Sequence, residues 1–547
     1  MKRLIINTIL LLFSFHLLGQ EVSEALAVRM ATHYFQTIDS KQRNIDIDNE
    51  SAQIANHKVN RPEQISPNGR ANMWLVPVEA GWVLLSSNIK ATPILAYIPS
   101  FEKPVYDSLP PAAQELLDGY EDYIAYINEH ETRYEADSRW LEVINQEVNR
   151  NIDRDLTSTF IGPLLSVEWG QSGGGSCATN KIYNKFCPAV VDPSCCNKAP
   201  AGCVAVAIAQ IMWYWNWPYA AQIPQTIGGN DTLLTFYDWS QMPTSINDDT
   251  NMASVNMIAS FLRDCGYKLG TNYGAGGSSA EDEDAKKTLK AFGYDENTID
   301  LRHKWMTSGW TNMLRTNIDN GQPVYYSGYS KSIGGKGHAF VVDGYQTGNS
   351  PIYHINWGWI GLYNGWYNID DAYVNDTIHY EHWQSAIFGI RPAPRYCTDL
   401  TITTVESPKF CIAQAGTVTL NGVQMSNITD GRIFSETGIT LTAGTSIANG
   451  CHVLFDIKPI PCDPLGAPAF NNHRYMENEE TVVEHITNQY TQDPPLKYLE
   501  IYSIDGKLVR QSSNMETVIS SLSNGVYIVK AIMESGDFFQ SKIFIQK

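Results

Sequence analysis

Cysteine is missing from the first part of this 547-residue chain, because none of the ten cysteines precedes Cys177. That absence excludes a disulfide framework and thiol chemistry from the N-terminal part. The cysteines further along fall into two groups with one between them, which is typical of a chain that forms disulfides in an oxidising compartment. A zinc site in the first group is the alternative, but no ligand spacing repeats and no histidine lies close in sequence. The positions are Cys177, Cys187, Cys195, Cys196 and Cys203, then Cys265, then Cys397, Cys411, Cys451 and Cys462.

Basic residues are also scarce, since 39 Lys and Arg stand against 58 Asp and Glu and give a net charge of −19. A chain with this balance offers no basic surface to displace counterions from phosphates, so nucleic acid is excluded as a partner. Long apolar runs are absent after the first twenty residues, and we expect no later membrane span. Met1–Gln20 itself has a basic start followed by an apolar stretch, which predicts a secretory signal peptide, with a retained anchor as the alternative.

The length predicts several domains, and changes in composition place their boundaries. After the signal peptide we predict an α+β unit at residues 21–157 and a second α+β unit at residues 158–393. A β-rich module and linker follow at residues 395–490, and a small all-β sandwich occupies residues 496–547. In the first unit the patterns predict helices at Val22–Gln36 and Ala112–Ile144, and strands at Met73–Pro77, Trp82–Ser86 and Pro93–Tyr97.

The second unit holds the residues with chemical potential. An apolar helix is predicted to begin at Cys203 and to end before Pro218, directly after a turn that contains Gly202. A thiol at a helix N-terminus is a candidate nucleophile, because the unsatisfied N–H groups favour the thiolate. The alternative is that Cys203 is half of a disulfide, since a cysteine-rich loop precedes it. Predicted strands follow the helix at 323–326, 338–343, 353–357, 365–369 and 386–390, so this unit should have a helical lobe and a sheet lobe.

His338 is the candidate general base, since it starts a β-branched strand directly after Gly337, at the edge of a glycine-rich loop. Asn356 could orient the imidazole through its amide, and the indoles of Trp357 and Trp359 could shield the site from water. His354 is a competing base, although its neighbours indicate a packed strand. Gln171 could donate its amide to an oxyanion hole together with the backbone N–H of Cys203.

Residues 165–393 resemble the streptopain family (family C10) of papain-like cysteine peptidases. The matching stretches are Trp169–Gln171, Tyr183–Asn184, Cys187–Pro188, Gly202–Met212, Trp217–Pro218, Pro323–Val324, Ser327–Gly328, Gly337–Tyr345 and Asn356–Trp359. The resemblance implies a papain-like two-lobed fold with Cys203 as nucleophile, His338 as general base and acid, and Gln171 in the oxyanion hole. It implies substrate contacts near Trp359 and Gly337, and leaves open whether Asn356 or Trp357 orients His338. Ile360 departs from the family, which has glycine there, and the extra cysteines could trap Cys203.

The two ends of the chain carry further resemblances, of which the N-terminal one is the weaker. Trp74–Pro77, Gly81–Ser86 and Pro93–Tyr97 are similar to the family's inhibitory propeptide, which implies a precursor cut near residues 150–162. Leu499–Tyr502, Asp505–Val509 and Ile519–Lys530 are similar to the type A sorting domain of the type IX secretion system. That likeness implies export and contact with the secretion machinery, and an ordinary β accessory domain is the alternative.

Together these patterns predict a secreted or cell-surface cysteine endopeptidase that is made as a zymogen. Its substrates would be proteins or peptides, its inhibitor its own propeptide, and it would need no metal or organic cofactor. One alternative is an acyltransferase of the transglutaminase type, which hands the thioester to an amine. The other is a surface adhesin whose peptidase-like domain is inert.

Overall fold

The computed structural model describes residues 21–42, 61–79, 81–100, 102–130, 133–145, 160–227, 229–329, 337–346, 352–369, 384–405, 407–449, 451–458, 460, 496–503, 508–512, 525–533 and 538–545. The predicted signal peptide at residues 1–20 lies outside these ranges. The chain divides into two compact units, residues 1–469 and residues 470–547. Among the described residues, no helix combines the length and the apolar character that crossing a membrane requires.

The N-terminal segment is a β-meander with a helix against each face. Its elements are α2 (Glu24–Gln42), β1 (Glu63–Ile65), β2 (Met73–Val78), β3 (Gly81–Ser86), β4 (Ile94–Ile98), α3 (Pro111–Glu129) and α4 (Ser138–Asn145). Alternate residues of the strands point to opposite faces, so Trp74 and Val83 pack with α2 while Leu75 and Leu84 pack with α3. The three predicted strands are confirmed.

The prediction of one helix over Ala112–Ile144 is wrong, because the structure has two helices there. The first ends at Glu129, and the second begins at Ser138. Asp137 starts the second helix, since its carboxylate accepts a hydrogen bond from the backbone N–H of Arg139 at 2.9 Å. Asp competes well for backbone N–H groups at helix starts, and this local signal interrupts the periodic pattern.

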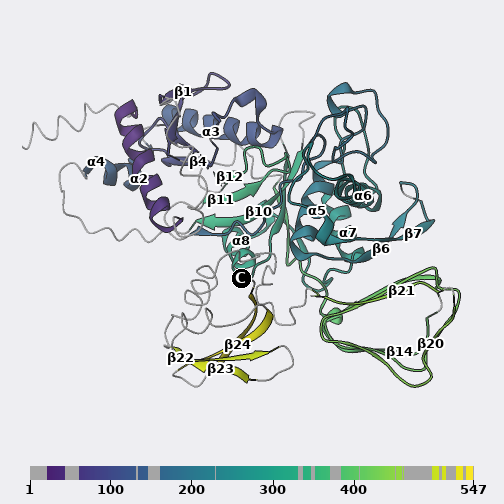
Figure 1. Cartoon of the computed structure of the whole chain (residues 1–547). Helices are drawn as coiled ribbons and strands as arrows, with labels where there is room; N and C mark the ends of the chain where they lie inside the picture. The colour runs from purple at the N-terminus through teal and green to yellow at the C-terminus, as the bar shows by residue number, and fades with distance from the viewer. Residues whose placement is uncertain are drawn as a thin grey trace, which may run out of the picture. The chain divides into compact units, whose positions relative to one another are not determined.

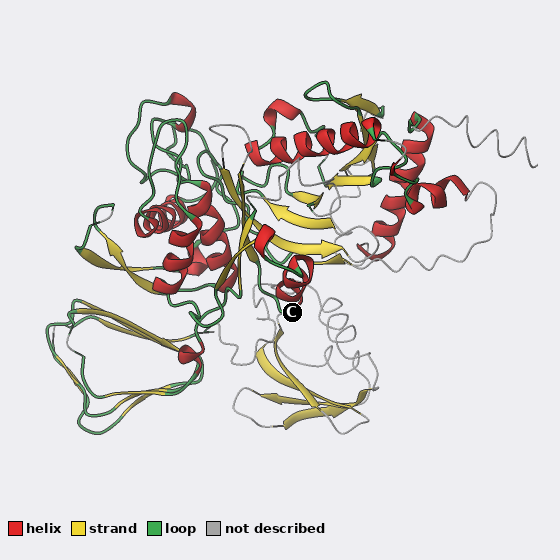
Figure 2. Cartoon of the chain, turned by 180° about the vertical axis from the view of Figure 1, so that it is seen from behind, coloured by secondary structure: helices red, strands yellow, loops and turns green. Residues whose placement is uncertain are grey.

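The central segment joins a helical lobe to a sheet lobe, as predicted. The helices are α5 (Cys203–Trp215), α6 (Met252–Leu269), α7 (Asp282–Ala291) and α8 (Trp310–Asp319). Figure 2 shows α5, α6 and α7 gathered on one side of the sheet. The strands are β5 (Phe160–Ile161), β6 (Ala220–Pro224), β7 (Thr232–Phe236), β8 (Asp300–His303), β9 (Val324–Tyr329), β10 (Gly337–Gln346), β11 (Ile352–Asn356), β12 (Gly365–Asn368) and β13 (Ser385–Phe388).

One sheet runs through both segments in the order β1-β2-β3-β4-β12-β11-β10-β9-β13-β8 (Figure 1). The junction is the antiparallel pair of β4 and β12, with Tyr97 opposite Trp366 and Ala96 opposite Tyr367. The N-terminal segment therefore continues the sheet of the central segment through backbone hydrogen bonds, and its removal would leave β12 as an edge strand.

Strand β10 lies between two hydrophobic cores. Ala339 and Val341 pack on the side of α5, whereas Phe340 and Val342 pack with residues of α3 and α8 on the other side. This alternation is expected for a strand that is covered on both faces. Helix α3 belongs to the N-terminal segment, so that segment covers one face of the strand that carries His338.

Residues 398–458 form a coil of short parallel strands with a triangular outline (Figure 1). The strands are β14 (Leu400–Ile402), β15 (Lys409–Gln414), β16 (Val418–Leu420), β17 (Gln424–Met425), β18 (Asp430–Ser435), β19 (Ile439–Leu441), β20 (Ser446–Ile447) and β21 (Val453–Ile457). One face packs on the central segment, where Phe434 lies 5.0 Å from Tyr219 between ring centroids and the Arg432 guanidinium lies 3.9 Å from the Phe236 ring. The structure of these residues is β-rich, as the sequence predicts for this part of the chain.

The second unit contains one antiparallel sheet in the order β23-β22-β24-β25. Its strands are β22 (Leu496–Ser503), β23 (Leu508–Ser512), β24 (Gly525–Met533) and β25 (Phe538–Ile545). The sequence of this unit also predicts a hairpin turn at Asp505–Gly506 and a strand at Val518–Ile519, and both lie outside the described residues. The described strands form a single sheet, and the sandwich predicted for residues 496–547 stays a prediction, because the rest of this unit lies outside the described residues.

Glu121 on α3 is a fully buried carboxylate that organises the chain between β1 and β2. It accepts hydrogen bonds from the Ser66 hydroxyl and from the backbone N–H groups of Asn68, Arg70 and Ala71 at 2.5, 2.8, 2.7 and 3.1 Å. Burial raises the pKa of Glu121, but these hydrogen bonds outweigh burial and hold the pKa below its ordinary value. The ionised form is therefore favoured by folding.

We predict that Glu121→Gln weakens the N-terminal segment by about 2 kcal/mol or more at neutral pH, because hydrogen bonds to a charged acceptor are lost. A lowered folded pKa gives stability that is present above the unfolded pKa of about 4.3 and is lost as the pH falls. Hydrogen exchange of the Asn68, Arg70 and Ala71 amides measures the effect. Protection in the wild type should exceed that in the variant at pH 7, and the difference should shrink as the pH falls below about 4.3. Glu129→Gln, at an exposed site on the same helix, is the control and should behave like wild type throughout this range.

Candidate active site

Cys203 is the first residue of α5, and it is a free, partly buried thiol. Gly202 precedes it with φ 94°, a backbone conformation that favours glycine, and lies against the loop that carries Ser278. The backbone N–H of Ala201 donates to the carbonyl of Gln171 at 2.8 Å, which brings Gln171 beside the start of the helix. The disulfide alternative for Cys203 is thus wrong.

The protonation of Cys203 differs from what a helix N-terminus alone predicts. Burial raises the pKa of the thiol, and the Asp282 carboxylate raises it further. Hydrogen bonds from the backbone of Ala339 and Val204 lower the pKa without outweighing burial. The expected lowering by the N–H groups is therefore present but smaller than the cost of burying a thiolate. Because Ala339 follows His338 on β10, the sulfur lies next to the backbone of the candidate base.

His338 is buried at the head of β10, and its Nε2 lies 2.9 Å from the carbonyl oxygen of Trp357. A carbonyl can only accept, so Nε2 carries the proton and Nδ1 is left as the basic nitrogen. Burial lowers the pKa of His338 to about 4, although this hydrogen bond and the nearby Glu115 carboxylate on α3 oppose the shift. Imidazole and thiol are both uncharged at neutral pH in this state, and no hydrogen bond joins them among the described residues.

Asn356 does not contact His338 through its amide. Its Nδ2 donates to the Val167 carbonyl at 2.6 Å, and its Oδ1 accepts from Gln210 and from the backbone N–H of Gly358, each at 3.1 Å. Of the two orienting groups left open by the sequence, the Trp357 carbonyl is the one that the structure places on His338. The competing base His354 is engaged elsewhere, because its Nδ1 lies 2.6 Å from the Asp343 carboxylate inside the sheet.

The two residues predicted to contact substrate, Trp359 and Gly337, lie next to the segments that carry Gln171 and His338. Trp359 is partly buried, and its backbone bridges Gly170, the neighbour of Gln171. Gly337 is exposed at the start of β10. Ile360 has φ 59°, a left-handed conformation that is unusual for a β-branched residue, and its side chain lies against Gly170. Ile360, which departs from the family pattern, therefore packs against the segment that contains Gln171, the candidate oxyanion donor. This contact joins that segment to the turn at Trp357–Trp359.

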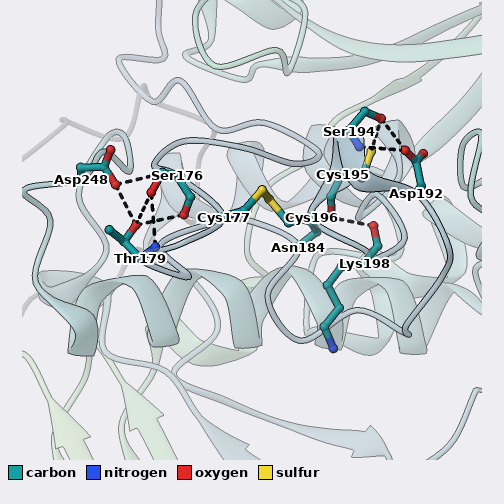
Figure 3. Close-up of a disulfide and its surroundings, with 10 residues drawn as sticks. All are labelled: Ser176, Cys177, Thr179, Asn184, Asp192, Ser194, Cys195, Cys196, Lys198 and Asp248. Atoms are coloured by element: carbon teal, nitrogen blue, oxygen red, sulfur yellow. Dashed lines mark hydrogen bonds between the residues drawn. A yellow bond between two sulfur atoms is a disulfide. The ribbon is translucent and has the colours of Figure 1, made fainter.

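The loop before Cys203 is closed by a disulfide between Cys177 and Cys196, whose Cα atoms lie 5.3 Å apart (Figure 3). Cys195 beside it is free, and the Asn184 amide donates to the carbonyls of Cys195 and Lys198 at 3.0 and 3.1 Å. The trapping of Cys203 by Cys195 or Cys196 that the sequence allows is absent in this structure, since Cys196 is bonded to Cys177.

Sequence reasoning missed two buried groups at this site, Gln210 and Asp282. Asp282 starts α7, and its carboxylate accepts hydrogen bonds from the hydroxyls of Tyr325 and Ser327 on β9 at 2.7 and 2.8 Å. It thereby ties the helical lobe to the sheet lobe next to Ala339, the register partner of Ser327. In the sequence, Asp282 lies in the acidic first turn of a helix. That position by itself indicates only a favourable interaction between the carboxylate and the helix dipole.

Comparisons with known proteins agree with this geometry. Residues 178–367 match the Peptidase C10 family, and residues 19–124 match the Spi protease inhibitor family. The chain is 30% identical over 280 residues to the thiol protease/hemagglutinin PrtT of Porphyromonas gingivalis, covering 46% of this chain and 30% of that protein. It is 30% identical over 219 residues to streptopain of Streptococcus pyogenes, covering 36% of this chain and 53% of that protein. The matched parts thus span about half or less of these relatives.

Two solved structures from Prevotella intermedia are also similar. A prointerpain A fragment is 21% identical, covers 60% of this chain and 98% of its own, and gives a TM-score of 0.43. Active interpain A cysteine protease is 26% identical, covers 42% of this chain and 94% of its own, and gives a TM-score of 0.34. Two parts of the chain are thus similar to the Peptidase C10 family and to the Spi protease inhibitor family, and this similarity supports the predicted enzyme class, a cysteine-type endopeptidase.

We predict that Asp282→Asn moves the pH dependence of Cys203 alkylation to lower pH, because a neighbouring negative charge is removed from the thiol. Mass mapping of the Cys203 peptide after short exposure to iodoacetamide measures the rate at each pH. Asp284→Asn, which removes the same charge from an exposed position on the same helix, is the control. Identical profiles for the two variants would contradict the assigned effect of Asp282.

Proposed function

We propose that the chain is the precursor of a secreted cysteine endopeptidase whose nucleophile is Cys203 and whose general base and acid is His338. The observation that carries the proposal is a free thiol at the start of α5 that accepts a hydrogen bond from the backbone of Ala339, the residue that follows His338. The Nε2 of His338 is held by the Trp357 carbonyl. That hydrogen bond leaves Nδ1 as the acceptor for the thiol proton.

The proposed reaction has two stages. Nδ1 of His338 takes the proton of Cys203, and the thiolate attacks the substrate carbonyl to form a tetrahedral intermediate. The Gln171 amide and the Cys203 backbone N–H stabilise its oxyanion, and one donor of this kind is worth about 2.7–4 kcal/mol of barrier. His338 then protonates the leaving amine, and water hydrolyses the thioester to release the acid and restore the thiol. Trp359 and Gly337 border the substrate.

The N-terminal segment is proposed to keep the precursor inactive. Helix α3 covers the face of β10 on which Phe340 packs, and β4 extends the sheet through β12. This cover contributes to the burial that holds His338 uncharged, since the imidazole stacks on Phe340 and Glu115 of α3 lies near it. Removing residues 21–157 would admit water to the imidazole and raise its pKa, since desolvation is the largest cause of its lowered pKa. A more basic imidazole accepts the proton of Cys203 more readily.

We predict that the wild-type precursor, incubated under reducing conditions, matures to a fragment that begins near residue 160. Cys203→Ala should stay intact, because no other thiol can form the acyl intermediate. Cys195→Ala removes a second partly buried free thiol close by in sequence and should mature like wild type. N-terminal sequencing of the products over time provides the measurement.

The same matured protein distinguishes the proposed activity from its alternatives. With casein as substrate, new N-termini support hydrolysis, whereas cross-linked ladders would identify an acyltransferase. Lack of both, together with an unlabelled Cys203 after exposure to an epoxide thiol inhibitor, would favour an inert adhesin and contradict the proposal.

Export is proposed to depend on the C-terminal unit at residues 496–547, whose described strands form one antiparallel sheet among themselves. We predict that deleting residues 496–547 leaves the protein in the periplasm of a host with a type IX secretion system. Fractionation and immunoblotting measure the location. Unchanged appearance of the truncated chain at the cell surface or in the medium would contradict the sorting role.

A further inference from the structure

Two fully enclosed amides, Gln210 and Asn356, form a polar contact inside an otherwise apolar part of the helical lobe. Their side chains are 0% and 1% exposed. The Nε2 of Gln210 donates to the Oδ1 of Asn356 at 3.1 Å, and the Oε1 of Gln210 accepts from the backbone N–H of Trp169 at 3.1 Å. Asn356 in turn binds the Val167 carbonyl and the Gly358 N–H.

Backbone partners at both ends allow only one arrangement of the two amides. The Trp169 N–H can only donate, so it must face the oxygen of Gln210, and the Val167 carbonyl can only accept, so it must face the nitrogen of Asn356. The remaining nitrogen of Gln210 then meets the remaining oxygen of Asn356. Each of the four polar atoms has a partner, which is the condition under which a buried polar network fixes a single geometry.

The contacts of this pair reach the three segments that carry the proposed chemistry. Gln210 lies on α5, the helix that begins at Cys203. Trp169 is two residues before Gln171, the candidate oxyanion donor. Gly358 follows Trp357, whose carbonyl holds His338. No other pair of side chains among the printed contacts of the described residues joins these three segments.

We propose that Gln210 and Asn356 act as one positioning unit that sets the spacing of Cys203, Gln171 and His338. The proposal rests on the proposed peptidase function and adds Gln210, a residue without contact to substrate. It also gives Asn356 a different task from orienting the imidazole, since its amide is fully used inside the unit.

Loss of this positioning unit is expected to lower the rate of the chemical step. A misplacement of reacting groups by about 1 Å can cost about 100-fold in rate, while binding of the substrate chain along the cleft is unaffected. Loss of spacing therefore lowers kcat and leaves KM nearly constant, whereas a residue that only stabilises the fold changes the amount of folded enzyme and neither constant.

The test uses Gln210→Glu in the full chain, matured in trans by immobilised wild-type protein that is removed afterwards. Glutamate has nearly the same shape as glutamine, but its ionised carboxylate has no N–H to donate to Asn356. A carboxylate oxygen then faces the Oδ1 of Asn356, so two hydrogen-bond acceptors meet. We expect kcat per titrated Cys203 to fall about 10-fold to 100-fold with KM within about threefold of wild type. Gln384→Glu is the matched control, because Gln384 is also buried and its Oε1 accepts from the Tyr326 hydroxyl, which can donate equally to a carboxylate.

A second comparison asks whether the unit acts through the oxyanion segment. In a Gln171→Ala background, Gln210→Glu should cost much less than it does alone, since residues that act together are not additive. Should Gln210→Glu fail to fold, Asn356→Asp makes the same test from the other side, because its carboxylate cannot donate to the Val167 carbonyl.

Two results overturn the claim in distinguishable ways. An active wild type in which Gln210→Glu and Gln384→Glu have the same kcat and KM, or in which Gln210→Glu raises KM alone, overturns the positioning role and leaves the peptidase function intact. A matured wild type that hydrolyses no peptide and whose Cys203 reacts with no thiol reagent overturns the proposed function itself, and the positioning role with it.

Discussion

The hydrogen bond from Nε2 of His338 to the Trp357 carbonyl is the contact on which the proposed chemistry depends. It fixes the tautomer of the imidazole, because a carbonyl accepts and never donates. With Nε2 protonated, Nδ1 becomes the basic nitrogen available to a thiol proton. The turn that supplies the carbonyl is anchored by Asn356 and bridged to Gly170, so the orientation of the imidazole is linked to the segment of Gln171.

Burial determines the protonation states of Cys203 and His338 in this structure. Both the Cys203 thiol and the His338 imidazole are held uncharged chiefly because charge is costly away from water. Part of the cover belongs to α3, which comes from the segment that matches an inhibitor family. The same sheet that brings the N-terminal strands against β12 thus connects the inhibitor-like segment to the strand that carries His338.

Much of the site could be predicted from the sequence where the signal is local. A cysteine after a glycine turn and before an apolar run predicts a helix N-terminus, and α5 begins at Cys203 as expected. The strands of the sheet lobe follow from β-branched runs. The hydrogen-bond partner of Asn356 could not be predicted in this way. An amide between a strand and two tryptophans can bind the imidazole or join a buried network, and its partner is set by tertiary packing against Gln210. Asp282 shows the same limit, since its partners Tyr325 and Ser327 lie on a distant strand.

The measurement that most directly tests the account is the pH dependence of Cys203 alkylation on the intact precursor and on the same chain after removal of residues 21–157. Loss of the N-terminal cover should hydrate the site and allow the thiolate–imidazolium pair to form. The account predicts that the matured chain reacts rapidly at mildly acidic pH, where the precursor is nearly inert. Superimposable profiles for the two forms would contradict it.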